Sequence, residues 1–512
     1  MWIKAGYLGY IAYGKPLFVS NTESSLASVT TMIRHKIFVS SETGRLKRVL
    51  VHSPDSGLGK VVPSKAQDWL FEDIVHLDTI RKEYDYYIKI LLYFLDPQKI
   101  RGKLKDIDST TSNRNFFKPG TPNYFNSDAV VELQVLLIDI LKDDGIKQQL
   151  VASVCAIEAC TYALQEEMLT YSPVDLARLF FTGALLDDTL VFPPIPNFIF
   201  TRDIGIVIND HILLNKPMKE ARKREALLAK YIFFKHPMFA SYQTKILELQ
   251  ESSHHFLRSS DNPKAMVTLE GGDVMVVAPH HVLVGISERT SREAVAQVTK
   301  LLLDKGVVTK VTVVQIPSKR DYMHIDTVFT QIGKAAWVML GDFSMTSINI
   351  GKHHPVNAAL DLSPQPVGLC IAQFEKGKET TPKHFAALDE LLMDISVTDL
   401  HQKIDDVQII LSGNGEFPYD AREQWTDSCN VLVLKENVVL GYNRNDRTDA
   451  AFQRAGFTIV KVEDLLEDLE SGKVTTEQIE KTLILMPSAE LSRARGGFHC
   501  MSMPLWRDTY DE

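Results

Sequence analysis

The spacing of apolar and polar residues changes twice along the chain. Residues 46–52 have the pattern of a strand and are followed by a Ser-Pro-Asp-Ser-Gly turn. Between about residues 66 and 190 the apolar spacing is typical of helices instead. The predicted helices cover 80–95, 128–141 and 148–169, with a further helix beginning at Pro173. Strand patterns return after the Pro-Pro-Ile-Pro segment at 193–196, so a helical segment interrupts a strand-rich protein.

From about residue 200 onward the chain repeats one unit, which consists of a strand, a tight turn, a second strand, a basic loop and a helix. The units begin at Asp203, Asp273 and Asn430, and an arginine follows each second strand, namely Arg222, Arg289 and Arg444. In the second and third units a closing strand is predicted at 311–316 and 458–462. Such repeats predict pseudo-symmetric α/β modules around an axis, with the strand starts converging on one site.

Composition excludes several classes of protein. The 512 residues are 45% hydrophobic and 24% charged, which is ordinary for a globular chain, and 56 Lys and Arg against 65 Asp and Glu give a net charge of −9. This balance argues against a nucleic-acid partner. No stretch reaches the roughly 18 apolar residues that span a bilayer, so we expect no membrane partner. Five scattered cysteines do not form a disulfide framework, and their odd number favours the reducing cytoplasm.

The C-terminal segment 492–504 carries the clearest chemistry. Cys500 follows a Gly pair and lies close in sequence to Arg493, Arg495, His499 and Arg507. Nearby positive charge lowers the pKa of a thiol, so Cys500 is a candidate nucleophile. His324 and Asp326 stand two residues apart in an extended segment and offer an acid/base and a substrate ligand.

Further carboxylates belong to the segments Phe200-Thr201-Arg202-Asp203 and Leu269-Glu270-Gly271-Gly272-Asp273. Negative charge beside a cysteine raises the pKa of its thiol, so these carboxylates fit a nucleophile only if the substrate brings the positive charge. A guanidinium is planar and presents a fork of donors that two carboxylates can grip. Arg222, Arg289 and Arg495 would then hold the substrate's own carboxylate.

Six segments, taken in order, resemble the signature motifs of the arginine deiminase family. They are 197–203 (NFIFTRD), 269–273 (LEGGD), 285–291 (GISERTS), 323–329 (MHIDTVF), 422–425 (REQW) and 495–504 (RGGFHCMSMP). The resemblance implies a mixed α/β fold, a five-module α/β propeller of the pentein superfamily with pseudo-fivefold symmetry and an inserted all-helical domain. The expected domains are an extension at 1–40, the first part of the propeller at 41–65, the helical insertion at 66–190 and the rest of the propeller at 191–512.

The resemblance also implies hydrolysis of L-arginine to L-citrulline and ammonia through a covalent amidino-cysteine intermediate. By motif, Cys500 is the nucleophile and His324 the general acid/base. Glu270 assists proton transfer and holds the guanidinium, and Asp203 and Asp326 grip the guanidinium nitrogens. The substrate-binding residues by motif are Asn197, Phe200, Arg222, Arg289 and Arg495, the last on a gating loop. Alternatives on the same fold are an amidinotransferase, an arginine dihydrolase and a non-catalytic arginine-binding protein, which product analysis separates.

Some features depart from the family pattern or carry no function. Phe498 stands where many members of the family have Gly, Cys429 where Gly is usual, and 349–405 and 463–483 are long. The pairs at 254–255, 280–281 and 353–354 are adjacent histidines without further ligands at suitable spacing, so we expect no metal, and no cofactor. The resemblance implies a homo-oligomer, a dimer or larger, with the helical insertion as a possible interface.

Overall fold

A computed structural model describes residues 36–510, apart from 66, 67, 70, 72, 110–113, 251–265 and 346–367. The predicted extension at 1–40 therefore lies almost entirely outside the described residues, as do the histidine pairs 254–255 and 353–354. Within the described part of the chain, no helix has the length and apolar character needed to cross a membrane.

The described residues form five sheets, and each contains the same arrangement of three strands. An antiparallel pair comes first, and a third strand runs parallel to the second member of that pair. Here a module is one such sheet with its helices. The repetition agrees with the five modules and the α/β class expected from the sequence.

The strands of the modules, in the order of that arrangement, have the following bounds. Module 1 contains β18 (Met503–Arg507), β1 (Leu46–Val51) and β2 (Val130–Glu132). Module 2 contains β3 (Gly205–Ile208), β4 (His211–Leu214) and β5 (Ile246–Leu247). Module 3 contains β6 (Val274–Ala278), β7 (His281–Ile286) and β8 (Lys310–Gln315), extended by β11 (Cys370–Glu375) and β12 (Lys383–Phe385). Module 4 contains β9 (Phe329–Gly333), β10 (Ala336–Met339) and β13 (Gln408–Leu411). Module 5 contains β14 (Leu432–Lys435), β15 (Val438–Tyr442) and β17 (Thr482–Met486), with β16 (Thr458–Lys461) at its edge.

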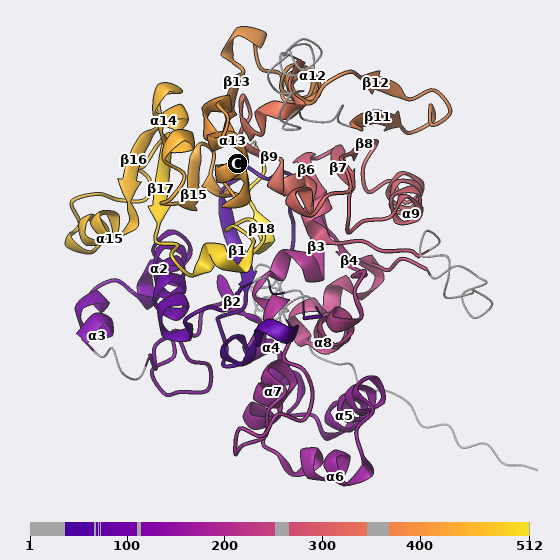
Figure 1. Cartoon of the computed structure of the whole chain (residues 1–512), viewed down its shortest axis with the longest axis vertical. Coiled ribbons are helices and arrows are strands. Elements are labelled where there is room, and N and C mark those ends of the chain that lie inside the picture. Colours follow the sequence, from indigo (N-terminus) through magenta and orange to yellow (C-terminus); the bar gives the residue numbers. More distant parts are fainter. Residues whose placement is uncertain are drawn as a thin grey trace, which may run out of the picture. The chain divides into compact units, whose positions relative to one another are not determined.

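Module 1 is built from both ends of the described chain. The strand β18 pairs antiparallel with β1, and the two lie side by side in Figure 1, yellow beside indigo. The strand β2 pairs parallel with β1, with Val49 opposite Val130. Because β2 lies inside the range 66–190, that range contains a sheet strand as well as helices. The boundaries of the helical insertion at 66 and 190 stay a prediction.

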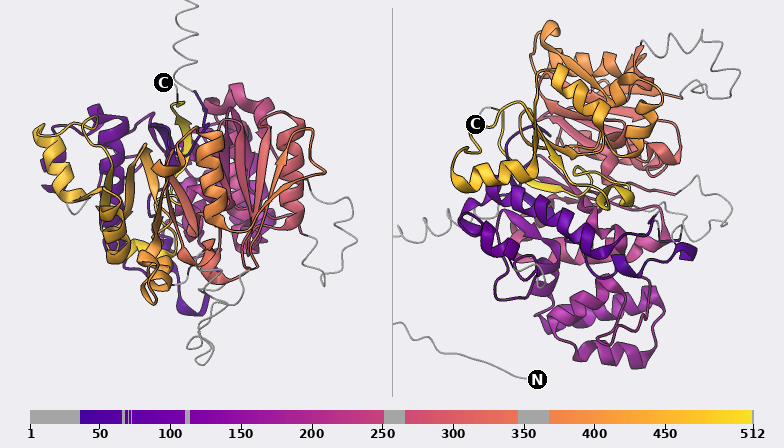
Figure 2. Two further views of the ribbon diagram at one scale, coloured as in Figure 1. Left: turned by 90° about the horizontal axis from the view of Figure 1, so that it is seen from above. Right: turned by 60° about the vertical axis from the view of Figure 1, so that its left-hand side comes forward.

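The helical part of the protein follows β2 directly. It consists of α4 (Leu133–Ile140), α5 (Asp144–Glu158), α6 (Tyr162–Thr170) and α7 (Pro173–Thr182). The last three lie together at the lower end of Figure 1, and the right-hand view of Figure 2 shows the same grouping. The single helix expected over 148–169 is two helices, because Ala159 adopts a left-handed conformation with φ of 52° that ends α5. Earlier in the chain, α2 (Leu77–Leu95) and α3 (Leu104–Ser109) precede β2, and α2 packs against α15 and β2.

Further helices belong to modules 2 to 5, and most of them bury apolar side chains. They are α8 (Lys223–Lys235), α9 (Arg292–Asp304), α12 (Leu388–Asp394), α13 (Tyr419–Trp425), α14 (Asp446–Arg454) and α15 (Val462–Ser471). In α9 the Ser291 side chain accepts a hydrogen bond from Ala294 N and caps the helix, while Val295, Val298 and Leu302 are buried.

The closing strand of module 5 differs from the sequence prediction. The segment 458–462 was expected to complete this unit, and β16 does form there. However, β17 pairs with β15, and β16 pairs with the far edge of β17. The helix α15 and the turn that follows it carry the chain back to this inner position.

Candidate active site

The five modules supply one side chain each from the same place in their architecture. Two to four residues before the first strand of each module stand Cys500 (β18), Asp203 (β3), Glu270 (β6), Asp326 (β9) and Asn430 (β14). All five are buried. In the middle three modules a short 3₁₀ turn carries or follows the residue, for example Gly271–Asp273 after Glu270. Of the three unit starts predicted from the sequence, Asp203 and Asn430 are in this set, whereas module 3 supplies Glu270 instead of Asp273.

One pocket is lined by nine of the ten residues that the sequence assigns to a site. They are Asn197, Phe200, Asp203, Arg222, Glu270, Arg289, His324, Arg495 and Cys500. The tenth, Asp326, is not part of this lining but contacts Cys500 directly. Arg320, Met323 and Ala494 complete the lining of this pocket.

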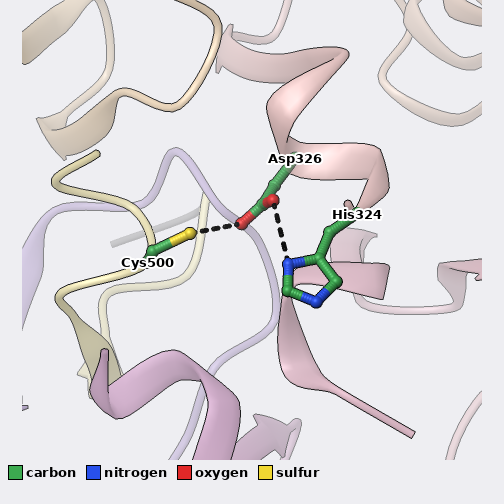
Figure 3. A group of neighbouring side chains, drawn as sticks. All are labelled: His324, Asp326 and Cys500. Atoms are coloured by element: carbon green, nitrogen blue, oxygen red, sulfur yellow. Dashed lines mark hydrogen bonds and ion pairs between the residues drawn. The ribbon is translucent and has the colours of Figure 1, made fainter. Parts of the chain in front are cut away.

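Asp326 stands between the candidate nucleophile and the candidate acid/base (Figure 3). Its Oδ2 lies 3.5 Å from Cys500 Sγ, and its Oδ1 lies 3.9 Å from His324 Nδ1. On the other side of the ring, His324 Nε2 lies 3.0 Å from Glu270 Oε2. Burial lowers the pKa of His324, but the hydrogen bond to Glu270 and the charges of Asp203 and Asp273 outweigh it and raise the pKa to about 10. The ring is therefore an imidazolium at neutral pH.

The thiol of Cys500 is in a setting that disfavours its ionisation. Burial raises the pKa of Cys500 well above its ordinary value, and the charges of Asp326 and Asp203 add to the rise. The expectation that arginines near Cys500 in sequence lower this pKa is wrong. Arg493 pairs with Asp73, and Arg507 donates to Gly44 O and Val433 O. The second expectation, that carboxylates surround the thiol, is confirmed.

Arg222 organises the carboxylates of the pocket. Its Nη1 lies 2.9 Å from Asp203 Oδ2 and 3.2 Å from Glu270 Oε2, and its Nε donates to Glu225 Oε2 at 2.7 Å. Burial raises the pKa of Glu270, but the charge of Arg222 and the hydrogen bond from His324 hold it well below its ordinary value. Asp203 and Glu270 are thus held through one oxygen each.

The other oxygen of each carboxylate is free to receive a donor. Among the residues that the structure describes, Asp203 Oδ1, Glu270 Oε1 and Asp326 Oδ1 are buried and have no hydrogen-bond partner. Leaving a buried acceptor unpaired costs about 1–3 kcal/mol, more for a charged group. Three such oxygens beside one thiol therefore describe a place for a cationic ligand with several N–H donors.

The remaining predicted residues lie at the wall and the mouth of the pocket. Asn197 donates from Nδ2 to Trp69 O at 2.7 Å, and the ring of Phe200 lies against Gly496, whose added Cβ would be 2.4 Å from it. Arg289 is buried and contacts Met323 Sδ at 3.8 Å through Nη2. Arg495 has φ of 59°, and its guanidinium lies 3.5 Å from the centre of the Trp425 ring.

Three residues of the sequence repeat, Asp273, Asn430 and Arg444, do not line this pocket. Asp273 accepts hydrogen bonds from Ile325 N at 3.0 Å and from Ser287 Oγ at 2.6 Å, so it holds the loop that carries His324. Arg444 contacts Ser492 Oγ and lines a separate hollow together with Trp425 and Arg493.

Two further residues contact the reacting groups and were not assigned from the sequence. His499 lies 2.9 Å from Asp326 Oδ2 through Nδ1, and Asn430 lies 3.1 Å from Cys500 Sγ through Nδ2. For Asn430 the signal was its place at the start of a repeat unit. For His499 the sequence offers only its position next to Cys500.

Two groups in the pocket have donor atoms close enough to hold a metal ion. They are His324, Asp326 and Cys500, and Asp203, Glu270 and His324, with the donor atoms of each group within 4.8 Å of one another. Arg222 already bridges Asp203 and Glu270, so the second group is arranged around a guanidinium. Away from the pocket, His280 and His281 both hydrogen-bond Asp399, at 3.0 and 2.7 Å. The absence of a metal stays a prediction.

Comparison with known proteins identifies relatives along most of the chain. The arginine deiminase family model matches residues 176–507. An arginine deiminase of Borreliella afzelii (strain PKo) is 28% identical over 484 residues, which cover 92% of this chain and 98% of that protein. An arginine deiminase of Bacillus cytotoxicus is 27% identical over 502 residues, covering 93% and 99%.

Solved structures give weaker similarity. An amidinotransferase from Microseira wollei, of the saxitoxin biosynthetic pathway, matches with a TM-score of 0.44 and 11% identity over 93% of this chain and 98% of that chain. Because this score is below 0.5, the fold rests on the five sheets themselves. The family match includes every residue that lines the pocket, from Asn197 to Cys500. The chain therefore belongs to the arginine deiminase family.

Proposed function

We propose that this protein hydrolyses L-arginine to L-citrulline and ammonia through a covalent amidino-cysteine intermediate. The observation that carries the proposal is the set of three unpaired carboxylate oxygens, on Asp203, Glu270 and Asp326, beside the buried thiol of Cys500. A guanidinium supplies planar N–H donors to such oxygens and brings the positive charge that the buried carboxylates favour. Family membership supports the same substrate.

In the proposed binding mode, Asp203, Glu270 and Asp326 grip the guanidinium nitrogens of the substrate. Arg222 and Arg289 receive its α-carboxylate. Arg222 Nη2 and Arg289 Nε are both buried and, within the described residues, have no hydrogen-bond partner, so each has a donor to offer. Asn197 and Phe200 form the wall, and Arg495 closes the mouth from its place on Trp425.

The first step is activation of Cys500 by the substrate. The free enzyme holds a neutral thiol, since burial and Asp326 raise its pKa. Binding of the guanidinium places a positive charge next to the sulfur and lowers that pKa, so the thiol gives its proton to a solvent water molecule. His324 does not take this proton, because its raised pKa of about 10 means that it is already protonated.

The thiolate then attacks the guanidinium carbon and forms a C–S bond. His324 gives its proton to the departing nitrogen, which leaves as ammonia, and an amidino-thioether remains on Cys500. The neutral His324 next removes a proton from a water molecule that attacks the same carbon. The C–S bond breaks, the thiolate of Cys500 is regenerated and citrulline is released. Glu270, 3.0 Å from His324, stabilises the imidazolium at both ends of this cycle.

We propose further that the protein acts in the cytoplasm on free arginine, without a nucleic-acid or membrane partner, and assembles as a dimer or larger homo-oligomer. The domain boundaries at 40, 65 and 190 belong to the same proposal. Light scattering at several concentrations tests the oligomer. Limited proteolysis followed by mass spectrometry tests the boundaries, since exposed linkers are cut first.

The experiment that tests the function incubates the purified protein with L-arginine and measures citrulline, ornithine and ammonia. Citrulline and ammonia in equal amounts are expected, with no product from Cys500→Ala and full activity in Cys370→Ala, which removes an exposed cysteine far in sequence from the site. Substantial turnover by Cys500→Ser would contradict the covalent route. Ornithine with doubled ammonia would indicate the dihydrolase, and arginine binding without any product would indicate a binding protein.

A further inference from the structure

We propose that Asn430 is a further catalytic residue, whose side-chain amide donates a hydrogen bond to the sulfur of Cys500 and stabilises its thiolate. The inference rests on the proposed function, because it assigns a role within the same reaction. Asn430 is buried at the start of module 5, and its Nδ2 lies 3.1 Å from Cys500 Sγ.

The orientation of the amide follows from its three contacts. The backbone N–H of Cys500 points at one end of the Asn430 side chain at 3.0 Å, and a backbone N–H can only donate, so that end is the oxygen. The other end is therefore the NH₂ group. One of its contacts is Asp326 O at 3.3 Å, which can only accept, and this agrees with the same orientation. The second hydrogen of the NH₂ group is directed at the sulfur.

The charges around the sulfur give this contact its chemical importance. Asp326 Oδ2 also contacts the sulfur, at 3.5 Å from Sγ, and it is a carboxylate oxygen that opposes a thiolate. Burial and the charges of Asp326, Asp203 and Asp427 all raise the pKa of Cys500, whereas the hydrogen bond from Asn430 lowers it. An amide donor provides this stabilisation without adding a charge that would repel the guanidinium.

The repeat architecture places Asn430 with the other reacting groups rather than with the framework. In modules 1 to 4 the residues two to four positions before the first strand include Cys500, Asp203, Glu270 and Asp326, and each of these lines the pocket or contacts the sulfur. Asn430 occupies that position in module 5. The backbone of Gly497 also passes close to Asn430, so that a Cβ added to Gly497 would lie 2.8 Å from Asn430 Oδ1. The loop of residues 496–500, here called the nucleophile loop, therefore lies directly against the amide.

The same hydrogen bond serves two steps of the proposed reaction. It stabilises the thiolate that attacks the guanidinium carbon. When water has added and the C–S bond breaks, the electron pair returns to sulfur, and the amide N–H again stabilises the departing thiolate. Loss of the donor should therefore lower kcat more than it raises KM.

The test compares Asn430→Asp and Asn430→Ala with the matched control Asn443→Asp, which makes the same change at an exposed position. Iodoacetamide alkylation of Cys500 is followed from pH 6 to 10 by mass spectrometry of its peptide, without substrate. Alkylation at pH 8 should be at least tenfold slower in both Asn430 variants and unchanged in the control, and kcat for arginine should fall about 100-fold. An unchanged alkylation profile in either folded Asn430 variant would overturn the proposal.

A second measurement needs no Asn430 variant and so does not depend on its folding. Wild-type protein with ¹⁵N-labelled asparagine is titrated with pH and followed by NMR. One side-chain amide signal should shift with the same midpoint pH as the rise in thiolate absorbance at 240 nm. This shift should be absent from Cys500→Ala. No such signal would also overturn the proposal. The alkylation and the amide signal require no arginine, so they test the role of Asn430 even if the wild-type protein makes no citrulline. A lack of citrulline would contradict the proposed function and not the contact between Asn430 and Cys500.

Discussion

His499 contacts the same carboxylate oxygen of Asp326 that contacts the nucleophile Cys500. His499 Nδ1 lies 2.9 Å from Asp326 Oδ2, and the same oxygen lies 3.5 Å from Cys500 Sγ. Burial raises the pKa of Asp326, but the hydrogen bond from His499 and the nearby positive charges, among them His324 and Arg202, together outweigh it, so the pKa is lower than usual and the carboxylate is ionised. Nδ1 is therefore the donor. This leaves Asp326 Oδ1 for the substrate and holds the carboxylate in one orientation.

His499→Ala should release that orientation and lower kcat about 10- to 100-fold, since small misplacements of a reacting group have effects of this size. The effect on KM should be smaller, because the pocket keeps Asp203 and Glu270. His499→Asn retains an amide donor near the same place and should recover part of the activity. Steady-state kinetics on arginine measure both constants. Equal activity in the wild type and His499→Ala would show that the contact does not position Asp326.

Arg222 compensates three buried carboxylates, those of Asp203, Glu225 and Glu270. Arg222→Met should lower the free energy of unfolding by about 3–5 kcal/mol at pH 8, because it leaves buried charges unpaired. Without Arg222 the folded-state pKa values of these carboxylates rise above their unfolded values, so the folded state binds more protons and the lost stability returns as pH falls. Urea unfolding at pH 5 and pH 8 measures this change.

The control for Arg222 is Arg289→Met, at a buried arginine whose nearest carboxylate in the described structure, Glu288, is 3.8 Å away. This variant should lose substrate affinity with a smaller change in stability and little dependence on pH. If both variants had the same pH dependence, the compensation of the three carboxylates would not be the cause.

Part of the site could be predicted because Asp203 and Asn430 stand at the starts of repeat units. Cys500 and His324 were candidates from their sequence neighbours, and the family motifs then assigned roles to them and to Glu270. The charge around Cys500 could not be predicted in this way, because neighbours in sequence need not be neighbours in space. Arg493 follows Glu490 at the surface and pairs with Asp73, which is 420 residues earlier in the chain.

The missing parts of the fold also have physical reasons. The strand β2 has three residues and runs directly into α4, so its apolar residues were included in a helical pattern. The order of β16 and β17 in module 5 depends on pairing across the sheet, and the local pattern of 458–462 contains no information on it. Contacts such as His499 with Asp326 depend on the packing of module 1 against module 4.

His52 should make the stability of the protein depend on pH. Its Nδ1 lies 2.9 Å from Glu132 and its Nε2 3.2 Å from Asp55. Burial lowers the pKa of His52, but the hydrogen bonds that its ring donates to these carboxylates and their negative charges together outweigh it and raise the pKa to about 9. A raised folded-state pKa contributes stability that is fully present below about pH 6.5 and is lost between about pH 6.5 and 9.

The rise of the His52 pKa from 6.5 to about 9 corresponds to a contribution to the free energy of unfolding on the order of 3 kcal/mol at low pH. Urea unfolding of the wild type should show this decline, and His52→Gln should reduce it. His76→Gln, at an exposed histidine before α2, is the matched control and should behave as the wild type. A His52→Gln protein with the wild-type pH dependence would exclude His52 as the cause.

Phe498 stands two residues before Cys500, and its fully buried ring lies between Tyr87 and Tyr442 at 5.0 and 4.9 Å. Tyr442 also donates its hydroxyl to Gly496 O at 2.7 Å, so these rings hold the nucleophile loop in place. Phe498→Gly should lower the free energy of unfolding by about 3–5 kcal/mol and raise KM through a loosened loop. Phe498→Leu should lose less of both, because it refills most of the volume. Urea unfolding and steady-state kinetics on the two variants measure these effects, and a Phe498→Gly protein as stable as the wild type would show that the ring does not restrain the loop.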